Sequence, residues 1–94
     1  MNEIKVKIDY SRSFVKQLKK APLYIKIAFR NKLSLFLKNP FHPLLNNHSL
    51  KGKYSYCRSI NVTGDWRAIF SEISDKKERV VIFVAFGTHS QLYK

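Results

Sequence analysis

The chain of 94 residues carries eighteen Lys and Arg against six Asp and Glu, which gives a formal net charge of +12. This length suits one small domain, and we expect residues 1–94 to form it. An apolar fraction of 45% excludes a disordered basic tail. The segment 10–64 holds eleven Lys and Arg and no carboxylate. It cannot neutralise itself, so we expect a surface that binds nucleic acid or an acidic protein, the alternative being a solvated face without a ligand.

Cysteine usage and hydropathy indicate the compartment. The single cysteine, Cys57, excludes an intramolecular disulfide framework and favours a reducing cytosol. The N-terminal residues have no signal-peptide apolar region. The longest apolar run, residues 80–86, is far shorter than the roughly 20 residues of a membrane helix. We therefore expect a soluble, cytoplasmic protein that makes no membrane contact.

The first third of the chain predicts a strand and two helices. Residues 4–9 alternate between apolar and polar, as a half-buried strand does. Ser11 is a suitable N-cap for a short helix, and Pro22 suits the first turn of a second one. Asn39-Pro40 ends that second helix, because proline disfavours the helical conformation in the residue before it. An apolar stripe at helical spacing supports the second helix: Ile25, Phe29, Leu33 and Phe36.

The remainder predicts a loop and three strands. Pro40 and Pro43, together with two asparagines and a glycine, make residues 41–52 a loop that carries His42 and His48. Strand-like runs follow at 54–60, 66–73 and 79–86, and the last is apolar on both faces, like a covered central strand. The order β-α-α-β-β-β indicates an α+β fold, with two helices packed on one side of a mostly antiparallel four-stranded sheet and a short C-terminal tail.

No cofactor or metal motif is present. Glycine-rich phosphate loops, CxxC and HExxH are absent. The spacing of the single cysteine and the three histidines matches no set of metal ligands. We therefore expect neither a cofactor nor a metal.

Polar residues suited to catalysis cluster in three places: residues 48–53, 65–67 and 87–93. Adjacent strand ends would bring these clusters to one groove. Metal-free RNA cleavage needs such a set, because a base must deprotonate the ribose 2′-OH, cations must stabilise the phosphoryl charge and an acid must protonate the leaving 5′ oxygen. Each residue also has a structural alternative, with Trp66 in the core, Asp65 in a turn and Arg58 in a cross-strand pair.

Three motifs resemble one known family. The ending Gly87-Thr88-His89-Ser90-Gln91-Leu92-Tyr93 is similar to that of the YafQ branch of the RelE/ParE toxins, as are Asp65-Trp66 and His48-x-Leu-x-Gly52. The resemblance implies a type II toxin–antitoxin toxin, an endoribonuclease that cuts mRNA in the ribosomal A site without a metal. It also implies an acidic antitoxin that wraps the toxin in a heteromeric complex, and contact with operator DNA only through that antitoxin.

The resemblance also implies residue roles. His48 and His89 would transfer protons, Asp65 would act in acid–base chemistry or orient a histidine, and Tyr93 and Trp66 would contact the substrate. Residues that would add charge or substrate contacts are Arg58, Arg67, Lys51, Lys53 and Asn61. Two positions depart from the branch: Asn61 replaces a histidine, and Ala85 replaces an arginine.

Two other functions are compatible with the same fold. One is a ParE-like toxin that inhibits DNA gyrase, although the ParE proteins lack the histidine set. The other is a catalytically weak relative that binds RNA or the antitoxin only.

Overall fold

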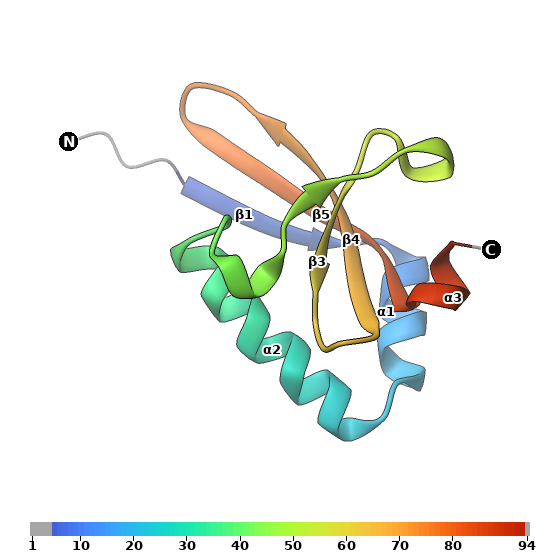
Figure 1. Cartoon of the computed structure of the whole chain (residues 1–94). Helices are drawn as coiled ribbons and strands as arrows, with labels where there is room; N and C mark the ends of the chain where they lie inside the picture. The colour runs from blue at the N-terminus through green and yellow to red at the C-terminus, as the bar shows by residue number, and fades with distance from the viewer. Residues whose placement is uncertain (1–4, 94) are drawn as a thin grey trace.

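The computed structural model describes residues 5–93 and forms an α+β fold (Figure 1). The sheet has five strands in the order β1-β5-β4-β3-β2, with β1 parallel to β5 and the other neighbours antiparallel. Ile4, the first residue of the strand predicted over residues 4–9, lies outside the described residues. The elements are β1 (Lys5–Tyr10), α1 (Arg12–Lys20), α2 (Leu23–Lys38), η1 (Pro43–Leu45), β2 (His48–Ser49), η2 (Gly52–Tyr54), β3 (Arg58–Asn61), β4 (Trp66–Ser74), β5 (Glu78–Thr88) and α3 (His89–Leu92).

The prediction of α+β architecture is confirmed, but the prediction of four strands is wrong. The extra strand is β2, which lies inside the predicted loop 41–52 and pairs with β3 through His48 and Ser59. The predicted strand 54–60 is shifted to β3, residues 58–61, because residues 52–54 form the 3-10 turn η2, whose first residue Gly52 adopts φ 67. The predicted C-terminal tail forms the single-turn helix α3.

Helices α1 and α2 begin and end where the sequence indicates. Ser11 caps α1 by accepting a hydrogen bond from the Phe14 N–H. Pro22 is the residue that precedes the first turn of α2, and Asn39 ends α2 in an extended conformation. None of the helices within residues 5–93 is long and apolar enough to cross a membrane.

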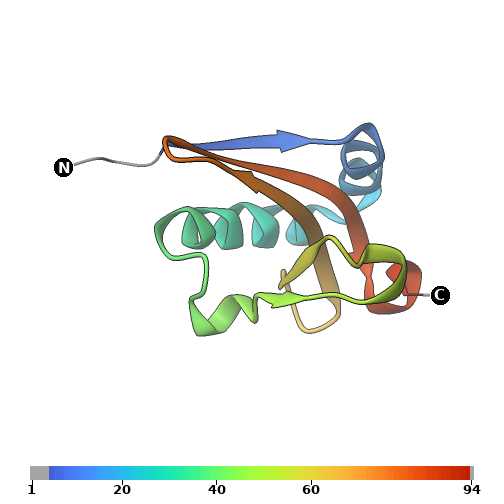
Figure 2. The same cartoon turned by 90° about the horizontal axis from the view of Figure 1, so that it is seen from above.

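Helices α1 and α2 lie on one face of the sheet (Figure 1, Figure 2). A cluster of phenylalanines joins them to it. The ring of Phe14 in α1 lies 5.4 Å from the rings of Phe29 in α2 and of Phe83 and Phe86 in β5. Further along α2, Phe36 contacts Phe70 of β4 at 5.1 Å. Each buried aromatic side chain contributes about 1.5 to 3 kcal/mol through the apolar area it buries. This cluster therefore fixes which face of the sheet the helices cover.

A β-bulge in β5 changes which residues face the helices. Ile69 pairs with Ala85 but Phe70 pairs with Phe83, so Val84 is an extra residue on β5. Side chains on β5 consequently change faces at Val84, and Phe83 and Phe86 both pack against the helices. Because of the bulge, Ala85 points to the opposite face, where it packs with Ile69 and Leu92.

Ser11, the N-cap of α1, and Gln17 within α1 satisfy backbone groups of β5 at and beyond the bulge, where pairing with β1 has ended at Phe83. The Ser11 hydroxyl donates to the Val84 carbonyl at 3.1 Å, and the Phe86 N–H donates to Gln17 Oε1 at 2.8 Å. The C-terminal half of β5 is covered on both faces, by the helices on one and by Leu92 on the other, as its apolar run predicts.

Replacing Gln17 by methionine should destabilise the fold by about 1 to 3 kcal/mol, since the Phe86 N–H would be buried without an acceptor. Gln17→Glu retains an acceptor oxygen at the same position and should cost less. The free energy of unfolding in urea measures both variants. Equal stability of the methionine variant and the wild type would show that this hydrogen bond does not support the bulge.

Candidate active site

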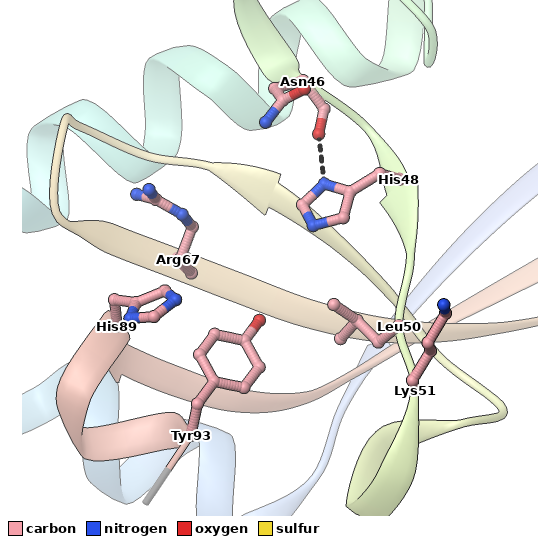
Figure 3. A pocket seen from close by; sticks show the side chains of 7 residues that line it. All are labelled: Asn46, His48, Leu50, Lys51, Arg67, His89 and Tyr93. Atoms are coloured by element: carbon pink, nitrogen blue, oxygen red, sulfur yellow. Dashed lines mark hydrogen bonds between the residues drawn. The ribbon is translucent and has the colours of Figure 1, made fainter.

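A polar pocket of about 390 Å³ opens on the face of the sheet opposite to the helices (Figure 3). None of the lining side chains within residues 5–93 is acidic. The lining includes His48, Arg67 and His89, which belong to three different elements. The complete lining consists of Asn46, His48, Leu50, Lys51, Arg67, His89 and Tyr93. The pocket thus brings together residues from all three predicted polar clusters.

Strand register explains why the pocket lies on this face. Directly paired residues of antiparallel strands place their side chains on the same face. His48 pairs with Ser59 and Ser59 pairs with Ile69, which belongs to the apolar cluster on this side. Arg67 is two residues before Ile69 on β4, so it shares that face.

His48 is oriented by a backbone carbonyl. Its Nδ1 lies 2.7 Å from the Asn46 carbonyl oxygen (Figure 3). A carbonyl only accepts, so Nδ1 carries the proton and, in the neutral ring, Nε2 has the free lone pair. Nε2 points into the pocket (Figure 3). His48 is therefore held as a tautomer that accepts a proton on its pocket side.

Asn46 is a site residue that the sequence analysis did not identify. It adopts the left-handed conformation with φ 46, and that backbone turn brings its carbonyl to His48. Asparagine tolerates this conformation better than most residues. The Asn46-Asn47 pair just before His48 was the available sign of such a turn.

The motif at 87–93 builds the second wall of the pocket. Thr88 and Gln91 form a capping box, in which the Gln91 N–H donates to Thr88 Oγ1 and the Thr88 N–H donates to Gln91 Oε1. A Cβ on Gly87 would lie 2.9 Å from that Gln91 oxygen, so any other residue there would push the end of the Gln91 side chain out of its place in the capping box. Leu92 is buried in the apolar cluster and anchors α3 on the sheet. As a result, His89 is fixed at the first position of α3.

Tyr93 lies against His89. The two rings are 4.7 Å apart between centroids, and the Tyr93 hydroxyl points toward the space between His48 and Arg67 (Figure 3). Arg67 is also fixed, because its Nη1 donates to the carbonyl oxygens of Thr63 at 3.0 Å and Trp66 at 3.1 Å. These two hydrogen bonds fix the direction in which the remaining guanidinium N–H groups of Arg67 point.

Asp65 contacts the site through its backbone. Its carbonyl accepts a hydrogen bond of 3.0 Å from the His89 N–H, and its carboxylate does not line the pocket. Lys51 lines the pocket, whereas Lys53 lines a neighbouring one. The structure thus places Asp65 beside His89 and both lysines on the η2 side of the site.

Trp66 and Arg58 lie on the helix face of the sheet, outside the pocket. The Trp66 indole packs 5.6 Å from the Phe86 ring and is half-buried at the edge of the core.

Asn61 on β3 pairs with Arg67 on β4, and its buried Oδ1 has no hydrogen-bond partner within residues 5–93. Ala85 is 4% exposed beneath α3, so its position contributes packing.

Arg58 holds the loop that carries His48. Its Nε donates to Asn47 Oδ1 at 2.7 Å and its Nη2 donates to the Asn47 carbonyl at 3.3 Å, while the guanidinium stacks 5.3 Å from the Phe41 ring centroid. Asn47 Nδ2 in turn donates to the Pro40 carbonyl at 2.9 Å. Arg58 therefore orders the residues on both sides of η1, next to His48.

Within residues 5–93, no three His, Cys, Asp or Glu side chains lie close enough together to hold a metal ion. Burial raises the pKa of the Cys57 thiol, which packs with Leu50 and Tyr54 in the apolar cluster beneath η2.

Comparison with known proteins identifies the family. The family model described as "Bacterial toxin of type II toxin-antitoxin system, YafQ" matches residues 6–94. The chain belongs to the YafQ toxin family. It is therefore a toxin of a type II toxin–antitoxin system within the RelE/ParE superfamily, as the three motifs predict. A comparison with curated protein sequences gives no match.

Solved structures agree with this fold. The E. coli DinJ–YafQ toxin–antitoxin complex contains a chain with 25% identity and a TM-score of 0.76, over 97% of this chain and 100% of that one. YafQ from E. coli strain BL21(DE3) has 24% identity and a TM-score of 0.77, over 96% and 100%. A YoeB/ParE toxin from Agrobacterium tumefaciens has 15% identity and a TM-score of 0.73, over 88% and 98%.

Replacing Arg58 by lysine should loosen residues 40–48, because lysine keeps the charge but cannot make the two-pronged contact with Asn47. We expect faster amide hydrogen exchange in that segment and a loss of about 1 to 2 kcal/mol in unfolding free energy. The matched control is Arg30→Lys on the exposed side of α2, which should change neither quantity. Unchanged exchange in Arg58→Lys would contradict the role assigned to Arg58.

Proposed function

We propose that this YafQ-family toxin cleaves single-stranded mRNA by attack of the ribose 2′-OH on the adjacent phosphorus, without a metal. The observation that carries the proposal is the convergence of two histidines, an arginine, a lysine and a tyrosine on one pocket, to which the described part of the chain contributes no acidic side chain. Imidazoles supply proton transfer near neutral pH, and cations stabilise the charge that builds on the phosphoryl oxygens.

The geometry suggests a division of roles. His48 presents Nε2 to the pocket while Asn46 holds Nδ1, so His48 serves as the base that takes the 2′-OH proton. His89, on the opposite wall, is the acid that protonates the 5′ oxygen. Asp65 acts by fixing the His89 backbone. Arg67 and Lys51 bind the scissile phosphate, and Tyr93 orients the substrate beside His89.

The remaining cations attract the toxin to its RNA target. Most of the excess charge lies on α1 and α2, away from the pocket. A positive surface of this kind attracts RNA at long range and in a salt-dependent way. We infer that these helices steer the toxin to ribosomal RNA in the cytoplasm, and that cleavage takes place on translated mRNA in the ribosomal A site.

Replacing either His48 or His89 by alanine should reduce mRNA cleavage in a translating extract by about 100-fold or more, because each removes one proton-transfer group. His42→Asn is the matched control, since His42 lies outside the pocket and an asparagine can still accept from the Leu44 N–H. Primer extension on the mRNA measures the cleavage.

Two results would contradict the nuclease assignment. One is a wild-type protein that cuts no mRNA with or without ribosomes. The other is equal cleavage by wild type and both alanine variants. Inhibition of gyrase supercoiling without RNA cleavage would instead support the ParE-like function.

We also propose that a cognate acidic antitoxin neutralises the toxin, as the E. coli DinJ–YafQ complex suggests. A groove of about 460 Å³ between the helices and β1 suits such a partner. Its floor is apolar, with Tyr10, Leu18 and Phe29 among its lining, and Val15, which also lines it, is 51% exposed. Three cations edge the groove: Lys19, Lys26 and Arg30. An amphipathic segment with acidic side chains would match both features.

Reversing two of those charges, in Lys26→Glu/Arg30→Glu, should weaken antitoxin binding by about tenfold, chiefly by slowing association. The same charge change at Lys76→Glu/Lys77→Glu, in the distant β4–β5 turn, is the control and should have little effect. Surface-immobilised antitoxin gives both rate constants. If the two double variants lose affinity equally, the antitoxin recognises net charge and not this groove.

A further inference from the structure

A second pocket adjoins the candidate active site. It has a volume of about 210 Å³ and lies between the η2 turn and α3. Lys51 and Tyr93 line both pockets, so these two side chains form the shared wall. The remaining lining of the second pocket is Lys53, Tyr54 and Leu92. The two pockets therefore form neighbouring compartments along one surface.

The aromatic rings continue from one pocket into the next. Tyr93 contacts His89 in the first pocket and meets Tyr54 edge to face in the second, with ring centroids 6.3 Å apart and an interplanar angle of 88°. Lys53 Nζ lies 5.4 Å from the Tyr54 ring centroid. Aromatic side chains next to cations are the combination that binds unpaired bases and the phosphates between them.

The lining also defines the charge of the ligand. Among the described residues, the second pocket is lined by two lysines and by no acidic side chain, and Lys51 stands at its boundary with the active site. A neutral apolar ligand would offer these ammonium groups no anionic or polar partner. A ligand with a planar ring and a phosphate on one side of it would use both the tyrosines and the lysines.

We propose that the second pocket is a nucleobase subsite, which holds the base of the nucleotide next to the one in the active-site pocket. The base stacks on Tyr54, and the phosphate that joins the two nucleotides lies near Lys51 at the shared wall. The inference rests on the proposed ribonuclease function and deepens it, since it makes the substrate a single strand that fills two successive subsites.

The test measures binding, so it does not depend on cleavage. The probe is a six-nucleotide single-stranded RNA of mixed sequence with 2′-O-methyl groups throughout, which cannot undergo 2′-OH attack. Tyr54→Ala should weaken its binding by about 5- to 150-fold, the effect of losing one base–aromatic stack. Tyr54→Phe keeps the ring and should bind like the wild type. Tyr24→Ala, which removes a tyrosine that is 67% exposed on α2, is the matched control.

Abasic probes test the same point on the wild-type protein. Removing the base at one defined position should weaken binding as much as Tyr54→Ala does, and Tyr54→Ala should lose no further affinity for that abasic probe. The subsite is refuted if no abasic position matters, if Tyr54→Ala binds the full probe like the wild type, or if it weakens every abasic probe equally.

The outcomes separate the two proposals. A wild-type protein that cuts no mRNA but shows base-dependent binding through Tyr54 would retain the subsite and refute the nuclease. A wild-type protein that cuts mRNA while Tyr54→Ala binds and cuts equally well would retain the nuclease and refute the subsite.

Discussion

Phe83 and Phe86 pack against the same two helices although a regular strand would place them on opposite faces of the sheet. The bulge at Val84 makes this arrangement possible, and Ser11 and Gln17 of the N-terminal region satisfy its backbone groups. Everything after the bulge depends on it. Because Phe86 faces the helices, Gly87 faces the other side, and α3 can fold over it to bring its first residue to the pocket.

The two faces of the sheet differ in the kind of surface they offer. The helix face combines an aromatic core with the eight Lys and Arg of α1 and α2 and with an apolar groove beside β1. The opposite face has a smaller apolar cluster, centred on Ile69 and Leu92, and two adjoining polar pockets above it. Steering and partner binding can thus occur away from the pockets where the proposed chemistry takes place. A partner on the helix face would leave both pockets open unless it also reached around the sheet.

The sequence predicted the helices and most strands because their periodicity and caps are local, as at Ser11 and Asn39. It missed β2, because two residues carry no periodicity and only pairing with β3 defines them. The convergence of His48 with His89 followed from motif order. Motif order did not show on which face of the sheet Trp66 and Arg58 lie. The face of a strand residue depends on the register of pairing, and register depends on contacts distant in sequence.

The two positions at which the chain departs from the YafQ branch, Asn61 and Ala85, reduce the set of residues that can carry the proposed chemistry. Ala85 is buried in one cluster with Leu92 and its methyl group carries no charge, so in the proposed mechanism the phosphate must use cations from elsewhere. Arg67 pairs with Gly87, and glycine leaves room beside it for the first turn of α3. Asn61, an amide, cannot transfer a proton. In the proposed mechanism, proton transfer therefore falls to the two histidines on facing walls, and a displacement of either wall would remove one of the two proton-transfer groups from the pocket.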